Sequence, residues 1–254
     1  MSSMDVVIRH CCGLDELNAC VRLQQEVWNF SDREIVPLRL FVVAQKVGGQ
    51  VIGAFHGNEL VGFAMSIPGN RNGHLYLHSH MLGVRRSYRD LGVGRRIKLF
   101  QRDDALQHGI ELMEWTFDPL EIKNAWFNLE RLGAIVRRYL VNQYGLTSSP
   151  LHGGLPSDRF VAEWWLKSQR VEATLREGRH PPVKAERRVL VPAEIYHWKA
   201  QDATRERAAE VQLRNREALL AAFADGLAIL GHERDPLGNG ALLLARWDED
   251  WSYV

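Results

Sequence analysis

The chain has 254 residues, a formal net charge of +1 and a hydrophobic fraction of 46%. This length suits one large domain, or a core with an extension, and the apolar fraction is sufficient for a buried core. The near-neutral charge gives no electrostatic basis for binding nucleic acid or a membrane surface. No apolar run approaches the length of a transmembrane helix, so we expect no membrane association.

The cysteines and the N-terminus bear on the compartment. Cys11, Cys12 and Cys20 form no CxxC pair, and the first two are adjacent. This spacing suggests neither a zinc site nor a disulfide framework, so we expect reduced structural thiols. Residues 1–5 lack the basic and apolar regions of a signal peptide. We therefore expect a cytoplasmic protein.

Alternation and helical periodicity predict the first elements of the chain. A strand at Val6–His10 precedes a helix at Leu14–Trp28. Pro37 is expected at the first position of a second helix, which Gly48 and Gly49 end. Two antiparallel strands joined by a tight turn follow, at Gln50–His56 and Glu59–Pro68.

The middle of the chain predicts a strand, a loop, a helix, a second strand and a short helix. The strands are Leu75–Val84 and Leu112–Phe117. The long helix is Arg95–His108, and the short helix ends at Leu132 and Gly133.

The last part of the chain is less regular. A long loop at Tyr144–Pro156 precedes a strand at Phe160–Leu166, and Glu172–Arg188 reads as exposed and partly irregular. Asp202–Asp225 predicts an amphipathic helix with Asp202 as its N-cap. The residues expected on the apolar side of this helix are Ala209, Leu213, Leu220 and Phe223. The short strands expected around it are Val189–Val191, Leu227–His232 and Ala241–Trp247.

A glycine motif separates the strand Leu75–Val84 from the long helix. It reads Arg89, Asp90, Leu91, Gly92, Val93, Gly94. Glycines remove the Cβ atoms that would block a phosphate, and the helix N-terminus adds roughly half a positive charge. The motif therefore predicts a pyrophosphate-binding loop; the alternative is an ordinary surface turn before a helix.

The motif does not match two common nucleotide-binding patterns. A dinucleotide site needs a third glycine, and the chain has Ile97 at that position. The P-loop string G-x-x-x-x-G-K-[ST] does not occur. The order R-x-x-G-x-G after a strand instead resembles the acetyl-CoA loop of the GNAT acyltransferase superfamily, whose consensus is [QR]-x-x-G-x-[GA].

Further strings resemble a little-described bacterial subgroup of predicted GNAT acetyltransferases. They are Leu77 to Met81, Trp115 to Leu120, Asn124 to Asn128, Leu132 to Ala134, and Asp158-Arg159. The resemblance implies an α/β (α+β) GNAT fold, with a mixed, mostly antiparallel sheet that splays at the acetyl-CoA site between flanking helices. It implies a catalytic core at residues 5–147, and we expect residues 148–254 to form a C-terminal α/β extension packed on the core or on a partner subunit. GNAT proteins commonly dimerise, so a homodimer is expected.

The resemblance also implies where acetyl-CoA or coenzyme A binds. The expected contacts come from the end of the strand, the glycine loop and two amides on the later helix. The amides have an alternative interpretation as a helix cap and a solvent contact. The expected cofactor-binding residues are Leu82, Gly83, Val84, Arg89, Asp90, Leu91, Gly92, Val93, Gly94, Arg95, Asn124 and Asn128.

The strand before the loop also carries the candidate base. In the family a backbone N–H of this strand is the oxyanion donor, beside a bulge for which Gly83 is the expected residue. His78 falls where histone acetyltransferases of the superfamily carry a glutamate base, and His80 lies two residues on. A histidine there titrates near neutral pH and suits deprotonation of an ammonium. Its alternatives are a half-buried structural histidine, or a metal ligand together with His80 and His74; we expect no metal.

The general acid and the acceptor site each have candidate residues with an alternative role. The tyrosine that protonates the thiolate in the family is replaced by Leu129, so Tyr139 and Tyr144 are substitutes by sequence proximity alone. Each has a packing role as its alternative. Asp118 is a candidate to hold a substrate ammonium, or else begins a turn. Arg159 is a candidate to bind a substrate carboxylate, or else forms a surface ion pair.

The function expected from the resemblance is transfer of an acyl group, acetyl by default, to the amine of a small molecule or amino acid. A succinyl or other acyl donor fits the same loop. The replacement at Leu129 leaves a second class open, a non-catalytic or regulatory CoA-binding protein. A protein-modifying acetyltransferase is a third class, which requires an open groove.

Overall fold

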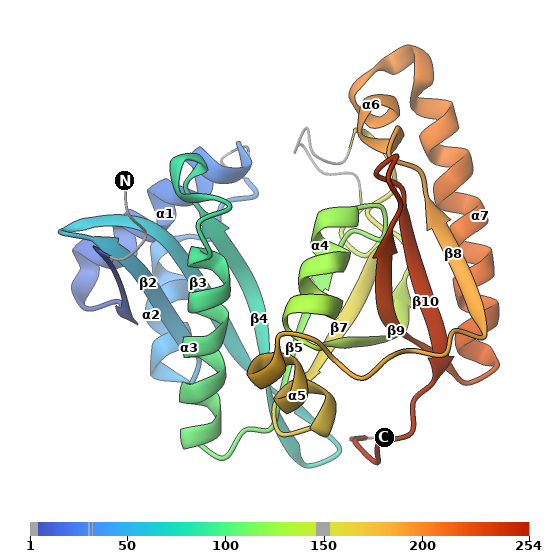
Figure 1. Cartoon of the computed structure of the whole chain (residues 1–254). Coiled ribbons are helices and arrows are strands. Elements are labelled where there is room, and N and C mark those ends of the chain that lie inside the picture. The colour runs from blue at the N-terminus through green and yellow to red at the C-terminus, as the bar shows by residue number, and fades with distance from the viewer. Residues whose placement is uncertain (1–4, 30, 32, 146–152, 254) are drawn as a thin grey trace. The chain divides into compact units, whose positions relative to one another are not determined.

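The computed structural model of the chain describes residues 5–29, 31, 33–145 and 153–253 (Figure 1). The chain divides into two compact units. The first contains residues 1–114 together with 253–254, and the second contains residues 115–252. The boundary falls inside one strand. The expected boundary at residue 147 concerns the family core and is a different division from this one.

The first unit is built on a sheet that begins with a meander of antiparallel strands. A two-residue turn joins β2 to β3, with His56 paired to Glu59 and Gly57 at φ 58°. That positive φ suits glycine and sets the tight reversal. The strands, in spatial order, are β1 (Val6–His10), β2 (Gln50–His56), β3 (Glu59–Arg71), β4 (His74–Val84) and the start of β5 (Leu112–Phe117).

Helices cover both faces of this sheet (Figure 1). α1 (Gly13–Trp28) and α2 (Leu38–Lys46) share one buried cluster with β2, β3 and β4. α3 (Val93–Gln107) shares a second cluster with β1 to β4, which includes fully buried Ile97. Each buried aliphatic or aromatic side chain of this kind contributes roughly 1.5–3 kcal/mol. Coverage of both faces explains why β2 is buried almost throughout.

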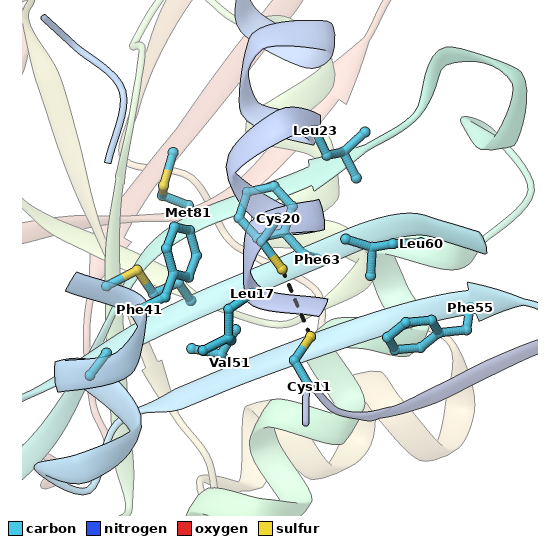
Figure 2. Close-up of a cluster of buried hydrophobic side chains, with 12 residues drawn as sticks. Cys11, Leu17, Cys20, Leu23, Phe41, Val51, Phe55, Leu60, Phe63 and Met81 are labelled. Carbon is cyan, nitrogen blue, oxygen red and sulfur yellow. Dashed lines mark hydrogen bonds between the residues drawn. The ribbon is translucent and has the colours of Figure 1, made fainter. Parts of the chain in front are cut away.

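Figure 2 shows the cluster beneath α1, where Cys11 and Cys20 meet. Their Sγ atoms are 3.8 Å apart, and both thiols are free. This contact and burial raise the pKa of the Cys20 thiol. These two cysteines therefore pack as small apolar residues, while Cys12 is exposed.

Most predicted elements of the first unit are present, and the differences lie at their ends. α2 begins at Leu38, so Pro37 is the N-cap and not the first helical residue. β3 extends to Arg71, three residues beyond the predicted end, because it keeps pairing with β4. Gly109, at φ 73°, lies just beyond α3 as predicted.

The second unit contains the rest of β5 and a further set of strands. β9 pairs with β6 at Val136 and Ile229, so the C-terminal strands join a sheet begun by residues before 148. Two strands alone make a marginal sheet, and this pairing makes β9 and β10 part of a larger one. The strands, in spatial order after β5, are β7 (Arg159–Trp165), β6 (Ile135–Leu140), β9 (Leu227–Arg234), β10 (Gly240–Arg246) and β8 (Arg187–Val191).

The helices of the second unit depart most from the sequence prediction. Residues 172–188 were expected to be irregular, but α5 (Gln169–Glu177) covers their first part, capped by Ser168, whose Oγ accepts from the Val171 N–H. α6 (Ile195–Ala200) was not predicted. The short α4 (Ile122–Trp126) continues into a π-helical turn at Phe127–Arg131. Residues 146–152 of the predicted loop lie outside the described part of the chain.

The long helix α7 (Arg205–Ala224) is present, but its predicted start and buried face were wrong. Asp202 lies in a preceding 3₁₀ turn and is not the N-cap. Leu213 and Leu220 are 51% and 41% exposed. The helix contacts β6, β8 and β9, and the packing strands select the face one residue away from the predicted one. The buried residues of α7 are Ala208, Val211, Gln212, Asn215, Leu219 and Ala222.

Candidate functional site

The glycine loop connects β4 to α3 within the first unit. Gly92 is the N-cap of α3, at φ 77°, and no side chain caps the helix there. Asp90 also has a positive φ, 60°, which is uncommon for a residue with a Cβ. The backbone N–H groups of the first turn of a 15-residue helix therefore have no side-chain cap at Gly92. This arrangement suits an anion such as a pyrophosphate.

The two glycines of the loop are required for different reasons. A Cβ on Gly92 would meet nothing within 4 Å, so the positive φ alone explains that glycine. Gly94 has no such φ, and a Cβ there would lie 3.6 Å from Leu82 Cδ2, an ordinary contact. Neither the fold nor the backbone requires glycine at position 94. A ligand that approaches the backbone closely does require it.

The side chains of the loop lie mostly outward. Arg89 and Leu91 are exposed, and the Arg89 Nε donates to the Val84 carbonyl at 3.0 Å. Val93 is buried in the cluster beneath α3, which anchors the loop. Arg95 is half-buried. The predicted cofactor contacts of these residues stay predictions, and the loop geometry is compatible with them.

The β4 strand carries a bulge, but not where the sequence placed it. Met81 pairs with Met65 and Ser79 pairs with Ser66, so His80 is the extra residue. Gly83 pairs regularly with Phe63 and does not form the bulge. A Cβ on Gly83 would lie 3.0 Å from Trp28, so close packing of α1 explains this glycine. A glycine in a strand signals either a bulge or a close approach, and here it signals the second.

Beyond the bulge, β4 turns its side chains to both helical layers. Leu82 and Val84 pack in the cluster of α3, while Met81 packs in the cluster of α1 and α2. Among the described residues, the parallel ladder from β4 to β5 consists of Leu77–Met113 and His78–Glu114. The β4 backbone after Ser79 is outside that ladder, as the family resemblance implies for a strand that pairs with pantetheine.

His78 and His80 lie close together, as predicted. Their ring centroids are 6.0 Å apart, and His78 is half-buried while His80 is exposed. Burial lowers the pKa of His78 to about 4, with a further decrease from His80 and an opposing increase from Glu114. Loss of solvation also lowers the pKa of His80. Both imidazoles are therefore neutral at physiological pH and able to accept a proton.

Two charged groups beside His78 were missed by the sequence reading. Glu114, buried on β5, accepts two hydrogen bonds from Arg71 at 2.6 and 2.9 Å. Lys98, on α3, is 3% exposed, and its Nζ donates to Ser79 Oγ at 2.8 Å. Burial lowers the pKa of Lys98 to about 7. The sequence of the helix gives no signal for the burial of this lysine, because that burial depends on the strands against which α3 packs.

The structure gives no support to a metal site at the histidines. Among residues 5–29, 31, 33–145 and 153–253, no group of three His, Cys, Asp or Glu side chains has metal-binding geometry. His74, the third proposed ligand, instead stacks on Tyr253 with ring centroids 4.4 Å apart.

Tyr139, the candidate general acid, is buried in the second unit and bonded to other side chains there. Its side chain is buried, and its hydroxyl donates to Asp158 Oδ2 at 2.6 Å. Arg216 binds the same carboxylate at 2.8 and 3.1 Å. Burial and the carboxylate raise the pKa of Tyr139. This environment favours the packing role over proton donation. Leu129, at the position of the family tyrosine, is fully buried.

The remaining predicted residues also lie in the second unit. Asn124 is exposed and Asn128 is 4% exposed, on either side of the change from α-helix to π-helix. Asp118 begins a turn by accepting from the Leu120 N–H, and it holds the ammonium of Lys199 at 2.9 Å. The turn is the alternative expected for Asp118, and the cation that it holds here belongs to the protein; binding of a substrate ammonium stays a prediction.

Arg159, the other candidate for the acceptor, is half-buried at the start of β7. Its guanidinium lies over the Tyr144 ring, 5.4 Å from the centroid. Tyr144 in turn lies 3.0 Å from Thr116 through its hydroxyl. Carboxylate binding by Arg159 stays a prediction.

The loop, the bulged strand and the helix that follows agree with one family. Residues 17–133 match the acetyltransferase (GNAT) family. The chain belongs to the GNAT family. GNAT enzymes use acetyl-CoA as their co-substrate. The match specifies the family and not the subgroup.

Solved structures agree on the GNAT fold. The ribosomal-protein-S18-alanine N-acetyltransferase from Escherichia coli is 13% identical, with a TM-score of 0.51 over 64% of this chain and 95% of that chain. The protein yncA from Salmonella typhimurium, solved with its cofactor acetyl-CoA, is 16% identical, with a TM-score of 0.51 over 66% and 99%. A GNAT-family protein from Desulfovibrio desulfuricans is 14% identical, with a TM-score of 0.52 over 63% and 99%.

At these sequence identities, the similarity establishes the fold and not the substrate. No curated protein matches the sequence of the chain. The GNAT fold covers about 64% of the chain, and a C-terminal extension accounts for the rest. Within the described ranges, no helix has the length and apolar character that a membrane crossing would need.

Proposed function

We propose that this GNAT acetyltransferase transfers an acetyl group from acetyl-CoA to the amine of a small molecule or amino acid by direct attack. Gly94 carries the proposal, because neither the fold nor the backbone requires glycine there, whereas a ligand at the backbone does. The uncapped N-terminus of α3 supports the same role, since it offers N–H groups to a pyrophosphate.

The residues of the first unit have complementary roles in this reaction. The α3 N-terminus holds the pyrophosphate, and the β4 backbone beyond the bulge at His80 offers a donor to the thioester oxygen. The neutral ring of His78 accepts a proton from the attacking amine, directly or through water. The lowered pKa of His78 keeps the ring unprotonated and free to accept a proton. It also makes proton transfer from the amine less favourable than transfer to an imidazole of ordinary pKa.

One of the charges near His78, that of Glu114, favours an acceptor that arrives as a cation, whereas that of Lys98 opposes it. The carboxylate of Glu114 raises the pKa of His78, in opposition to burial, which lowers it by more. An ammonium placed beside the same ring experiences the same attraction. The departing thiolate of coenzyme A takes its proton from water, since Leu129 replaces the family tyrosine and Tyr139 is committed to Asp158.

The test is a thiol-release assay with a panel of small amines and amino acids, run with acetyl-CoA and succinyl-CoA in parallel. We expect turnover with acetyl-CoA and at least one acceptor, and loss of turnover in the Gly94→Ala variant. A preference for succinyl-CoA would show that the acyl donor in the proposal is wrong, but it would leave the proposed binding site unchanged. Calorimetry that detects no binding of any of these thioesters to the folded protein would contradict the proposal.

A further inference from the structure

A buried lysine connects the helix of the glycine loop to the bulged strand. Lys98 lies in α3, four residues after Gly94, and is 3% exposed. Its Nζ donates to the hydroxyl of Ser79 on β4 at 2.8 Å. Ser79 immediately precedes the bulge residue His80. The inference below rests on the proposed function, since it concerns the same site.

Lys98 is costly for the stability of this fold. Burial lowers the pKa of its ammonium to about 7, which means that the folded protein disfavours the charged form. The neighbouring position on the same helix, Ile97, packs in the apolar cluster of α3. A leucine or methionine at position 98 would avoid the desolvation cost. The lysine therefore needs a reason other than packing.

The contacts of Ser79 indicate that reason. Its hydroxyl accepts from Lys98 and donates to Gln101 Oε1 at 3.2 Å, so two residues one turn apart on α3 hold one serine. Ser66 on β3 pairs with Ser79 next to the register shift and is held as well. The Ser66 hydroxyl donates to Gln50 Oε1 at 2.9 Å. Both members of the cross-strand pair on one side of the bulge are thus fixed by side-chain hydrogen bonds.

Gln50 closes the network back onto α3. Its Nε2 donates to the Gln101 carbonyl at 2.9 Å and to Asp104 Oδ2 at 2.7 Å. All the side chains that hold the two serines are nearly or fully buried. A buried polar network of this kind imposes one geometry on the backbone that it joins.

Lys98 also acts on His78 through its charge. The charges that act on this ring come from His80 on the same strand, Glu114 on β5 and Lys98 on α3. Glu114 raises the pKa of His78, while His80 and Lys98 lower it. Lys98 therefore has two effects. Its hydrogen bond to Ser79 restrains the geometry of the bulge, and its charge lowers the pKa of His78.

We propose that Lys98 is a positioning residue for acyl transfer, which fixes the β4 bulge through Ser79 and so aims the His78–His80 pair at the thioester. It does not touch the substrate. Helix α3, which begins at the glycine loop, thereby also fixes the backbone of β4, the strand that carries His78.

The first test compares Lys98→Met with Ser79→Ala, using Lys123→Met, an exposed lysine, as the control. We expect kcat to fall about 10- to 100-fold in both test variants, because a small misplacement of reacting groups has effects of that size. KM for acetyl-CoA and calorimetric CoA affinity should stay within about twofold of wild type. The double variant should lose no more than either single variant, since both act through one hydrogen bond.

The second test does not depend on turnover. In ¹H–¹³C spectra of the full chain, the His78 ring should titrate with a midpoint of about 4 in the wild type. Lys98 is protonated at that pH, so its replacement by methionine should raise the midpoint, and the Lys123→Met control should not. If Lys98→Met fails to fold, Ser79→Ala still tests the positioning through kcat.

The outcomes separate this proposal from the proposed function. A wild-type enzyme that turns over, beside folded variants with unchanged kcat, would overturn the positioning role and leave the function intact. A wild type without CoA binding or turnover would overturn the function. A His78 midpoint that stays fixed in Lys98→Met would overturn the link between the two residues in either case.

Discussion

Glu114 on β5 holds Arg71 on β3 through two parallel hydrogen bonds, with Nη1–Oε1 at 2.6 Å and Nη2–Oε2 at 2.9 Å. The Arg71 guanidinium also lies over the Tyr76 ring, 4.9 Å from its centroid. Bidentate pairing fixes the direction of this buried carboxylate. The register pairs Glu114 with His78, so a fixed negative charge lies beside the candidate base.

The glycine loop gives the most direct prediction. Gly94→Ala should leave the free energy of unfolding within about 0.5 kcal/mol of wild type, because its Cβ meets only ordinary contacts at an unstrained φ. CoA affinity, measured by calorimetry, should fall at least tenfold, since the Cβ occupies space that the pyrophosphate needs. Wild-type affinity in folded Gly94→Ala would contradict the assignment.

A matched pair of glycines at the two ends of α3 is a control for backbone strain. Gly92 and Gly109 have φ values of 77° and 73°, and a Cβ on either would meet nothing within 4 Å. Alanine at each should therefore destabilise the protein by a similar amount, about 1–2 kcal/mol. Only Gly92→Ala should weaken CoA binding. Equal effects on binding would assign the loss to strain and not to the loop.

The pH dependence of the reaction tests His78. A base works when deprotonated, and a lowered pKa moves the acid limb of kcat/KM downward, from the ordinary value near 6.5 toward about 4. His78→Ala should lower kcat by about 10²–10⁴-fold and leave CoA affinity nearly unchanged.

His80→Ala is the control for that experiment, since its ring lies 6.0 Å away on the same strand. Equal losses in the two variants would indicate packing or shared water positioning. Normal kcat in His78→Ala, with an unmoved acid limb, would show that the amine arrives neutral and that the protein contributes proximity and the oxyanion donor.

Tyr139→Phe should separate structure from catalysis. The hydroxyl donates to the Asp158 carboxylate at 2.6 Å, so its removal should lower the free energy of unfolding by about 1.5–3 kcal/mol. We expect kcat to stay within about twofold of wild type, because the raised pKa makes this phenol a poor proton donor. Denaturant unfolding and steady-state kinetics on the same sample measure both. A large loss of kcat without destabilisation would restore Tyr139 as the general acid.

The stability of the protein should depend on pH through Lys98. The pKa of this lysine is about 7 in the folded state, below its ordinary value of 10.5. Between these two pH values the unfolded state binds more protons, so stability rises with pH by about 1.4 kcal/mol per unit, and the desolvation cost is fully present below pH 7. The difference in unfolding free energy between Lys98→Met and wild type should therefore shrink from pH 6 to pH 10. A constant difference would contradict the shifted pKa.

The sequence alone determined the local and periodic features of this protein. The glycine motif, the strand before it and the helix after it follow from residues within one stretch of chain, and the fold assignment followed from their order. The proximity of His78 and His80 was also readable, because side chains two residues apart in a strand lie on one face. Turn and cap glycines such as Gly57 and Gly109 have positive φ values that glycine adopts without strain.

Tertiary structure decided what depends on a partner distant in sequence. The bulge lies at His80 and not at Gly83, because the register with β3 is a property of two strands. The buried face of α7 excludes Leu213 and Leu220, because the strands that it packs against select among several apolar faces of one helix. The low pKa of Lys98 likewise arises from burial by other elements, which no periodicity within α3 reveals.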